Sequence, residues 1–302
     1  MNRLLKSAYD AFPFKKQAFL FLKLFFSPGH DLQERLNFGG PFRVNVPGGH
    51  FIMQNYDGHD HVIENEVFWN GLAGNWEKHS LSLWMKLCAS AETIVDIGAN
   101  TGIYSLVAKA IRPTAQVYAF EPVERIFAQL RHNMALNNFD VVCLNAAVSD
   151  IDGTRMLFDG PGAHTYTASM DPSFIPNAVG TKVITTTLST FLRERRLESI
   201  DLMKIDVEKH EYEVLAGAAG LFGSKLPSML IEILTDELGG KIEQLLAGSG
   251  YVYNAIDETR GPFRCSMLRG TGAHNYLLCS AEKAKALGLE HEQDLSVERK
   301  EP

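Results

Sequence analysis

The clearest change from apolar to polar residues along the chain lies at residues 93–102, Thr-Ile-Val-Asp-Ile-Gly-Ala-Asn-Thr-Gly. Its apolar residues, which include Ile94 and Val95, predict a buried strand that ends in a turn of small residues. From Ile103 to Ile111 apolar residues recur at helical spacing, and Pro113 stops the pattern, so a helix should follow the turn. A strand, a tight glycine turn and a helix are typical of the first unit of a nucleotide-binding α/β sheet.

The same alternation continues through the rest of the chain. Apolar runs that end in polar or turn residues predict strands, and residues at helical spacing follow several of them. We expect strands at residues 116–120, 141–148, 154–158, 182–188, 202–206, 228–234, 251–256 and 275–279, and helices at residues 123–137 and 212–219. This order predicts an α/β sheet with parallel strands.

The first ninety residues have a different pattern. Residues 42–46 and 50–54 flank Pro-Gly-Gly, which is typical of a hairpin. Residues 64–90 carry apolar positions, among them all three tryptophans of the chain, and we interpret them as helical. We expect this accessory region to pack over the mouth of the sheet.

Composition and charge narrow the class of protein. With 45% hydrophobic and 22% charged residues, the 302-residue chain has the composition of a soluble globular protein. A formal net charge of −7 argues against nucleic-acid binding, which needs a basic face. The four cysteines lie far apart and include no Cys-x-x-Cys pair. We therefore interpret them as reduced thiols of a cytoplasmic protein and not as a disulfide or zinc framework.

The first 36 residues combine basic and aromatic side chains. The apolar run at residues 18–26 is too short to cross a bilayer, which takes about 20 apolar residues, and Lys23 interrupts it. No small-residue cleavage site follows, which argues against a signal peptide. A basic, aromatic-rich helix can lie on a membrane surface, although such helices more often pack on their own domain. Peripheral contact with the inner face of the membrane is therefore an alternative to a purely cytoplasmic location.

The turn after the first strand indicates which cofactor the sheet binds. Dinucleotide-binding turns follow Gly-x-Gly-x-x-Gly, so that backbone amides reach a pyrophosphate. Here Asn100 stands between Gly98 and Gly102, and Asp96 lies in the strand itself. A carboxylate there repels a pyrophosphate but attracts the ammonium of a methionine group. Glu121, at the tip of the second strand, suits the two hydroxyls of an adenosine ribose.

The Asp-x-Gly-x-Asn-x-Gly pattern followed by Glu121 resembles the S-adenosylmethionine site of class I methyltransferases, so we expect that cofactor. The residues expected to bind it are Asp96, Gly98, Asn100, Gly102, Glu121 and Asp150. Asp150 follows the third strand, where it would meet the adenine amino group, although a role as a turn residue before Gly153 is an equal alternative. A turn that merely packs a strand on a helix is the alternative for the whole motif.

A second informative stretch is Leu-Met-Lys-Ile-Asp-Val-Glu-Lys-His-Glu at residues 202–211. Its apolar residues predict a strand that ends at Asp206, with polar residues crowded at the carboxyl end. Glu232 lies near the end of the next strand, and an acid within such an apolar run is costly unless it is paired. We expect Glu232 to face the same cleft as Asp206.

Together these stretches resemble the FkbM-type methyltransferase family. The matching pieces, within residues 92–234, are Val95–Gly102, Ala119–Pro122, Leu136–Asn138, Ala147–Asp150, Thr187–Leu188, Lys204–Glu208, Val214–Gly217 and Leu230–Glu232. The resemblance implies a Rossmann-like class I fold, with a mostly parallel seven-stranded sheet and helices on both faces, and O-methylation of a hydroxyl. It also implies a methyltransferase domain at residues 91–281, between the helical and hairpin region (1–90) and a charged tail (282–302).

The proposed chemistry needs an acceptor oxygen aligned with an electrophilic sulfonium and a group that takes the proton of the hydroxyl. The candidates for catalysis are Asp206, His210, Glu208 and Glu232. His210 has the better unperturbed pKa for proton uptake, and Asp206 has the better predicted position. Lys209 stands where the family usually has glycine, which affects the local turn and the choice of base. His164, in an irregular loop, is the candidate if these fail.

Metal binding is an alternative at two places. His59 and His61, with Asp57 and Asp60, hint at metal ligands, but no partners stand elsewhere in the chain, so a solvated polar loop is the better interpretation. The carboxylates after the fourth strand could instead hold a divalent cation that orients a diol. Our assignment of the site includes no metal ligand.

The acceptor is the least defined part of this hypothesis. A small molecule or glycan is expected, because sugars of surface polysaccharides, glycolipids and polyketides all suit the family. An NAD-dependent oxidoreductase on a similar sheet and a non-catalytic cofactor-binding module are the competing function classes. The oligomeric state does not follow from the sequence.

Overall fold

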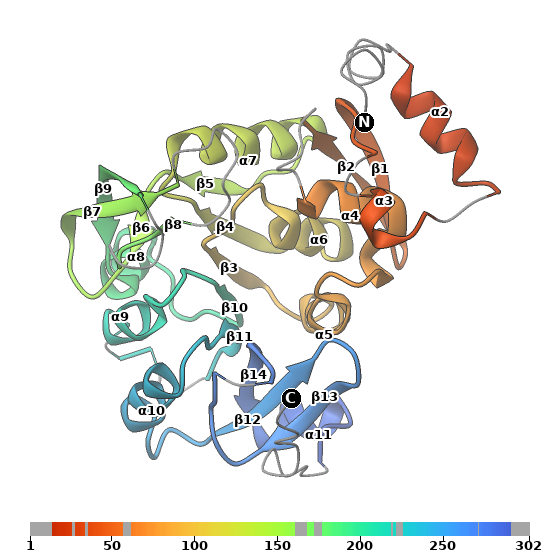
Figure 1. Ribbon diagram of the computed structural model, residues 1–302. Helices are drawn as coiled ribbons and strands as arrows, with labels where there is room; N and C mark the ends of the chain where they lie inside the picture. The colour runs from red at the N-terminus through yellow and green to blue at the C-terminus, as the bar shows by residue number, and fades with distance from the viewer. Residues whose placement is uncertain are drawn as a thin grey trace.

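The structure is a computed structural model that describes residues 14–25, 28–33, 36–56, 62–160, 168–171, 177–218, 220–221, 226–270 and 272–290. Within these residues the largest sheet has eight strands and runs through the centre of the molecule (Figure 1). From one edge to the other its strands are β13 (Gly261–Cys265), β12 (Tyr251–Asp257), β14 (Asn275–Ser280), β11 (Ser228–Glu232), β10 (Leu202–Ile205), β3 (Thr93–Ile97), β4 (Gln116–Phe120) and β5 (Val142–Leu144).

Five neighbouring strands are parallel, and their order reverses at one place. From β3 the chain moves outward to β4 and β5, whereas β10, on the other side of β3, is followed outward by β11. Ile97 at the end of β3 lies opposite Ile205 at the end of β10. Ligands of such sheets bind outside the carboxyl ends of the strands where the order reverses. A ligand is therefore expected beyond Ile97 and Ile205.

The other three strands extend the sheet beyond β11. β14 lies antiparallel between β11 and β12, and β13 forms a hairpin with β12. Without β13, the sheet has the seven strands that the family resemblance implies. The sequence analysis missed β13 because Pro262 lies inside a run of only five residues. A proline is tolerated there because β13 is an edge strand.

Helices cover both faces of the large sheet. Successive side chains of a strand point to opposite faces, so Ile94 is buried in one apolar core and Val95 in another. The helices of the first core include α5 (Lys78–Cys88), α6 (Ile103–Ile111) and α7 (Glu124–Leu136), and those of the second include α8 (Leu188–Arg195), α9 (Glu211–Ala216) and α10 (Asp236–Leu245). The expected arrangement of helices on both faces is confirmed.

A smaller sheet lies beside the large one, in the order β6-β9-β7-β8. Its strands are β6 (Ala147–Val148), β9 (Val179–Thr186), β7 (Gly153–Asp159) and β8 (Ala168–Ser169). The strand expected at residues 141–148 is in fact two strands. β5 ends at Leu144 and belongs to the large sheet, whereas β6 pairs with β9.

The strand expected at residues 182–188 is displaced. It starts earlier, at Val179, and ends at Thr186 because a helix begins directly after it. The side chain of Thr187 accepts a hydrogen bond from the backbone N–H of Thr190 and so caps α8.

The accessory region contains the expected hairpin, β1 (Gly40–Val46) and β2 (Gly49–Asn55). The hairpin packs against α6 and α7, and Asn137 exchanges hydrogen bonds with the backbone of Ile52. The helix expected at residues 64–90 is broken into α4 (Val62–Asn70), a 3-10 turn η1 (Gly71–Ala73) and α5. Among the described residues of the accessory region, those that line the cavity at the carboxyl ends of the strands come from this helical part and not from the hairpin.

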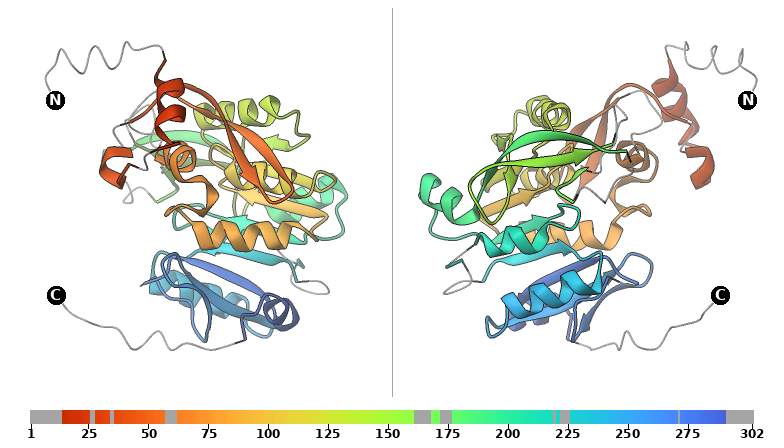
Figure 2. Two further views of the ribbon diagram at one scale, coloured as in Figure 1. Left: turned by 90° about the vertical axis from the view of Figure 1, so that its right-hand side faces the viewer. Right: turned by 60° about the vertical axis from the view of Figure 1, so that its left-hand side comes forward.

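Near the N-terminus, α2 (Lys15–Leu22) and α3 (His30–Gln33) lie at the margin of the molecule (Figure 2). No helix within the described ranges is long and apolar enough to cross a membrane. At the other end, Ala281–Ala286 forms α11, capped by Ser280, where the sequence analysis expected a frayed tail from residue 282. The loop with His59 and His61 and the loop with His164 lie outside the described residues.

Candidate active site

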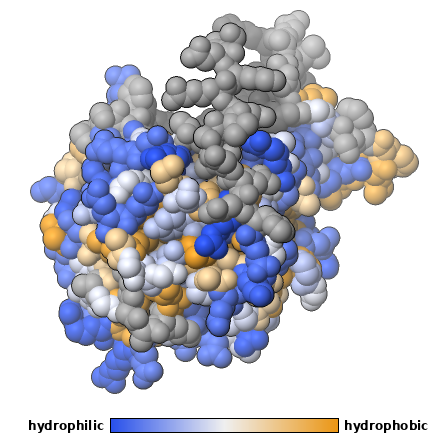
Figure 3. All heavy atoms as spheres, turned by 90° about the horizontal axis from the view of Figure 1, so that it is seen from below, coloured by the Kyte–Doolittle hydropathy of each residue, from blue (hydrophilic) through white to orange (hydrophobic). Residues whose placement is uncertain are grey.

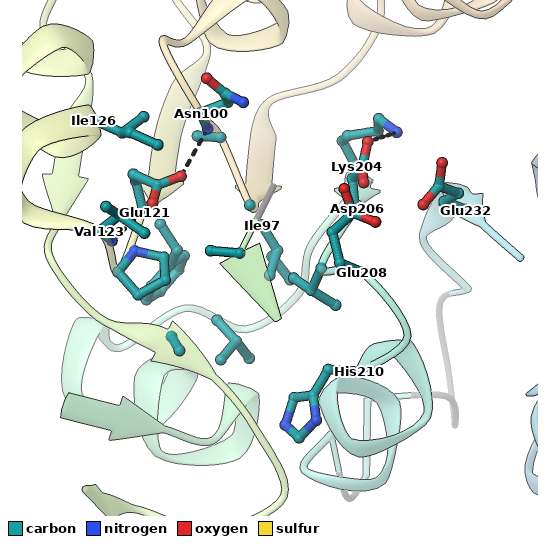
Figure 4. Close-up of a pocket in the computed structure, with 18 of the residues that line it drawn as sticks. Ile97, Asn100, Glu121, Val123, Ile126, Lys204, Asp206, Glu208, His210 and Glu232 are labelled. Carbon is teal, nitrogen blue, oxygen red and sulfur yellow. Dashed lines mark hydrogen bonds and ion pairs between the residues drawn. The ribbon is translucent and has the colours of Figure 1, made fainter. Parts of the chain in front are cut away.

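A cavity of about 280 Å³ lies at the carboxyl ends of β3, β4 and β10, where the order of the strands reverses. Figure 4 shows Glu121 and Asn100 on one side of it and Asp206, Glu208 and Glu232 on the other. The apolar part of the wall comes mainly from the segments after β4 and around β6. The cavity therefore has an apolar half next to Glu121 and an acidic half next to Asp206.

Gly98 lies between the apolar and the acidic half of the cavity. Its φ is +78°, and a Cβ atom placed on it would lie 1.8 Å from the carbonyl oxygen of Asp206. Any side chain at this position would push β3 and β10 apart at the point where both strands end. The glycine predicted from sequence is thus needed both for its backbone conformation and for the close approach of the two chains.

The Glu121 carboxylate is held by backbone amides. Oε2 accepts a hydrogen bond from the N–H of Asn100 at 3.0 Å, and Oε1 accepts one from the N–H of Val123 at 2.8 Å. Burial raises the pKa of Glu121 to about 7, although both hydrogen bonds act in the opposite direction. A fixed, buried carboxylate at the cavity wall is able to accept hydrogen bonds from a diol.

Two residues expected to bind the cofactor instead support the first turn from behind. Asp96 is buried, is not among the described residues that line the cavity, and accepts a hydrogen bond from the Ser105 hydroxyl at 2.7 Å. Burial raises the pKa of Asp96 to about 6. Gly102 is also absent from that lining, and a Cβ on it would meet Leu130 and Met134 of α7. In this structure both residues pack β3 and α6, and their contact with the cofactor stays a prediction.

Asp150 is a third residue that was expected to bind the cofactor. It too is absent from the described lining of the cavity, and its carboxylate forms an ion pair with Arg155 at 2.7 Å. The neighbouring β6 strand, at Ala147 and Val148, lines the cavity in its place. Of the six expected cofactor residues, the cavity brings together Gly98, Asn100 and Glu121.

The acidic half is built around a buried lysine. Nζ of Lys204 lies 3.0 Å from Oδ2 of Asp206 and 5.1 Å from the centre of the Tyr104 ring. Burial lowers the pKa of Lys204, but the nearby carboxylates of Asp206, Glu77 and Glu232 raise it more, so that the net shift is upward. Lys204 therefore stays charged and holds Asp206 in place.

Glu208 and Glu232 differ in their protonation. Burial, with repulsion from the Asp206 carboxylate, raises the pKa of Glu208 to about 7 and that of Glu232 to about 9. Oε2 of Glu232 has no hydrogen-bond partner in the described part of the chain. At neutral pH Glu232 is protonated, and its free oxygen is able to meet a polar group of a ligand.

His210 lines the same cavity but lies apart from the acids in Figure 4. Its Nε2 is 2.9 Å from the Ser149 hydroxyl, and its Nδ1 is 3.4 Å from a carboxylate oxygen of Glu213. Burial lowers the pKa of His210, although Glu213 opposes the shift. Both ring nitrogens thus already have partners in the protein.

The turn that carries these groups has an unusual backbone. Glu208 and Lys209 have φ values of +55° and +74°, in the left-handed region that favours glycine. The N–H of Val207 donates a hydrogen bond to Oε1 of Glu211, which fixes the entry to α9. Lys209 therefore adopts the backbone of the glycine that the family resemblance led us to expect there.

The sequence analysis missed an acid from the accessory region. Glu77 lines the cavity, adopts a φ of +43°, and accepts hydrogen bonds from the Tyr104 hydroxyl at 2.5 Å and from the side-chain amide of Asn275 at 3.2 Å. Its neighbour Trp76 and Ile63 of α4 also line the cavity. Burial raises the pKa of Glu77, and Lys204 opposes the shift. No local pattern marks Glu77, because its partners lie far away in sequence.

Across the described residues, no group of three or more His, Cys, Asp or Glu side chains is arranged to hold a metal ion. The acids of the cavity are instead spaced around the Lys204 ammonium.

Comparison with known proteins connects this site to a family. The model of the methyltransferase FkbM domain matches residues 96–253. The chain is 26% identical over 241 residues to 31-O-demethyl-FK506 methyltransferase FkbM of Streptomyces tacrolimicus. The aligned region covers 69% of this chain and 88% of the relative. It is 32% identical over 190 residues to methyltransferase sdnD of Sordaria araneosa, which covers 52% of this chain and 73% of the relative.

Solved structures similar to this chain include methyltransferase FkbM from Methylobacillus flagellatus KT, at 13% identity and a TM-score of 0.42, over 74% of this chain and 55% of that chain. The strand order, the reversal between β3 and β10 and the matched domain together identify the fold as the Rossmann-like class I methyltransferase fold. The matched domain spans more than half of the chain and includes both the glycine turn and the stretch from Lys204 to Glu208. The chain therefore belongs to the FkbM methyltransferase family.

Proposed function

We propose that this methyltransferase uses S-adenosylmethionine and methylates a hydroxyl of a sugar or related natural product. The observation that carries the proposal is the division of the cavity, with the backbone-held Glu121 on one side and the Lys204–Asp206 pair on the other.

The described residues fit S-adenosylmethionine. Glu121 would accept hydrogen bonds from the ribose hydroxyls, and Gly98 lines the cavity where β3 and β10 approach each other. The apolar side chains of Val123 and Ile126 would cover the adenine. When bound, the cofactor supplies an electrophilic methyl group on a positively charged sulfur. The Asp206 carboxylate, which lines the cavity, would stabilise that positive charge.

The acceptor hydroxyl would then meet the acidic half of the cavity. Asp206, oriented by Lys204, is our choice for the group that takes its proton. Glu232, protonated at neutral pH, would donate a hydrogen bond to a second oxygen of the acceptor. His210 is a weaker candidate because both of its ring nitrogens already have protein partners.

The name of one relative supports the choice of an oxygen acceptor. The relative in Streptomyces tacrolimicus is named as a methyltransferase of 31-O-demethyl-FK506. From this name we take the proposed reaction type, methylation of an oxygen. The class of acceptor we infer from the polar, acid-rich half of the cavity.

Calorimetry with S-adenosylmethionine, S-adenosylhomocysteine and NAD would test the cofactor assignment. We expect binding of the first two and none of NAD, and tight NAD binding alone would favour an oxidoreductase. Release of S-adenosylhomocysteine with a panel of sugars and polyols would then test catalysis.

The Asp206→Asn variant would test the role of the base. It should keep cofactor affinity within a few-fold and lower turnover by ~10²–10⁴, the usual range for a lost general base. The control is His210→Ala, which should reduce turnover far less. Full activity of Asp206→Asn, or equal losses in both variants, would contradict the assignment. Cofactor binding without turnover on any acceptor would favour a non-catalytic module.

A further inference from the structure

Helix α2 is anchored to the body of the protein by one of its faces. Phe19 is buried and contacts Phe38 and Trp69, with ring centroids 6.3 and 5.4 Å apart. Nζ of Lys23 lies 4.6 Å from the centre of the Phe68 ring and donates a hydrogen bond to the backbone carbonyl of Phe68. These contacts fix the orientation of α2 against α4, which carries Phe68 and Trp69.

The opposite face of α2 and the turn after it expose large apolar side chains to solvent. Phe21 is 63% exposed and Phe25 is 76% exposed, and their rings contact each other at 5.2 Å. Leu20 and Leu24, four residues apart like the two phenylalanines, are also exposed. Figure 3 shows apolar side chains at the edge of the molecule that carries α2. We call Leu20, Phe21, Leu24 and Phe25 the apolar face of α2. An exposed apolar patch of this kind marks a surface for association.

Its size argues against a protein partner. Eleven residues from Lys15 to Phe25 span about 16 Å at the helical rise, and a helix is about 10 Å wide. A stable protein interface needs roughly 800 Å² from each partner. The exposed side of these three turns does not supply such an area, but it is sufficient to enter the headgroup region of a bilayer.

The charge of this segment favours an anionic surface. The first 25 residues carry five basic side chains and one acidic one, whereas the whole chain has a net charge of −7. Lys16 and Lys23 donate hydrogen bonds to the uncharged backbone carbonyls of Pro41 and Phe68, which hold both side chains on the body of the protein without neutralising their charge. A local excess of positive charge beside an exposed apolar face is typical of helices that lie in a membrane interface.

We propose that the apolar face of α2 docks this methyltransferase on the surface of an anionic membrane, with Phe21 and Phe25 in the acyl–headgroup boundary. The inference is independent of the proposed reaction, because no residue of the face lines the cavity. α4 connects the two regions: it packs on α2 through Trp69, and its Ile63 lines the cavity. Docking would therefore hold the cavity at a fixed orientation to the membrane.

Sedimentation of the full chain with vesicles would test this proposal. We expect binding to vesicles of equal parts phosphatidylcholine and phosphatidylglycerol, weaker binding to phosphatidylcholine alone, and a decrease with added salt. The double variant Phe21→Ser with Phe25→Ser should bind the mixed vesicles at least about tenfold more weakly. Its thermal unfolding should be unchanged, because both side chains are exposed. The matched control is Ile184→Ser, which alters an equally exposed residue (61%) on β9 and should bind like the parent chain.

Two outcomes would overturn the proposal. One is equal vesicle binding by the parent and the double variant, or the absence of binding by both. The other is a parent chain that is dimeric without vesicles and a double variant that is monomeric, which would show that a second copy covers the apolar face.

Discussion

Replacing Lys209 by glycine should stabilise the protein, although it removes a side chain next to the site. Lys209 has a φ of +74°, where a residue with a Cβ pays roughly 1–2 kcal/mol in steric strain. Glycine avoids this strain but loses about 0.5–1 kcal/mol more backbone entropy on folding. The difference is a gain of about 0.5–1 kcal/mol, which corresponds to a rise of about 1–2 °C in Tm for a chain of this length.

Denaturant unfolding of the apo protein, with differential scanning calorimetry beside it, would measure this change. Two controls separate backbone strain from side-chain effects. Lys182 lies in the middle of β9 and does not have a positive φ. Lys182→Gly should therefore lower the free energy of unfolding by about 0.5–1 kcal/mol. Lys209→Met removes the charge but keeps a Cβ, so it should not gain stability. If Lys209→Gly destabilises as much as Lys182→Gly, contacts of the lysine side chain outweigh the strain and the reasoning is wrong.

The same variant has a second readout in activity. The Lys209 ammonium lowers the pKa of Glu208, while burial and Asp206 raise it to about 7. Without the lysine the pKa of Glu208 should rise further, so less of it is ionised at neutral pH. If ionised Glu208 contributes to turnover, the acid limb of the pH–rate profile should move to higher pH in both Lys209→Gly and Lys209→Met.

Three further changes test other parts of the molecule. Glu121→Ala should lower S-adenosylmethionine affinity at least about tenfold, since hydrogen bonds to a charged group contribute ~1.5–3 kcal/mol each, and calorimetry that finds unchanged affinity would exclude Glu121 as the ribose ligand. Gly98→Ala should fail to fold or lose cofactor binding, because its Cβ would lie 1.8 Å from the Asp206 carbonyl oxygen, and a soluble variant with normal affinity would contradict this. Burial raises the pKa of Glu211 from 4.5 to about 8, so the folded protein binds this proton more tightly than the unfolded chain. Unfolding free energy should therefore fall between pH 4.5 and 8 by up to ~1.4 kcal/mol per pH unit, and Glu211→Gln should flatten that slope. A slope unchanged in the variant would assign the pH dependence to other groups.

The central strands could be predicted from sequence because each is short, apolar and followed by a distinctive turn. The expected bounds of β3 and β4 agree with the structure, and β10 and β11 differ only at their ends. Elements at the margins of the sheet were harder to predict, because contacts with neighbouring segments determine where they form. β13 exists because β12 offers an edge that tolerates Pro262, and α8 begins because Thr187 caps it.

The sequence predicted that the site residues lie at the carboxyl ends of the parallel strands. It did not predict which of their side chains line the cavity. Asp96 stands only two residues before Gly98, yet it is not among the described residues that line the cavity and accepts a hydrogen bond from Ser105 of α6. Gly102 was expected to bind the cofactor, and in the structure a Cβ on it would meet Leu130 and Met134 of α7. Proximity in a motif thus does not establish contact with a ligand.

A buried lysine gives the one signal that could have predicted the missing acid. Lys204 lies inside the apolar strand β10, and a buried ammonium is costly unless carboxylates surround it. A lysine inside so apolar a strand indicates that acids lie nearby, and Asp206, 29% exposed, is only one of them. Glu232 was identified for a different reason, because it is itself an acid within an apolar run. Glu77 was not, because it comes from the accessory region and reaches Lys204 only through the left-handed turn before α5. The charge balance of the cavity therefore depends on a segment outside the matched domain, at residues 96–253, and removing residues 62–90 should impair the site itself and not merely its cover.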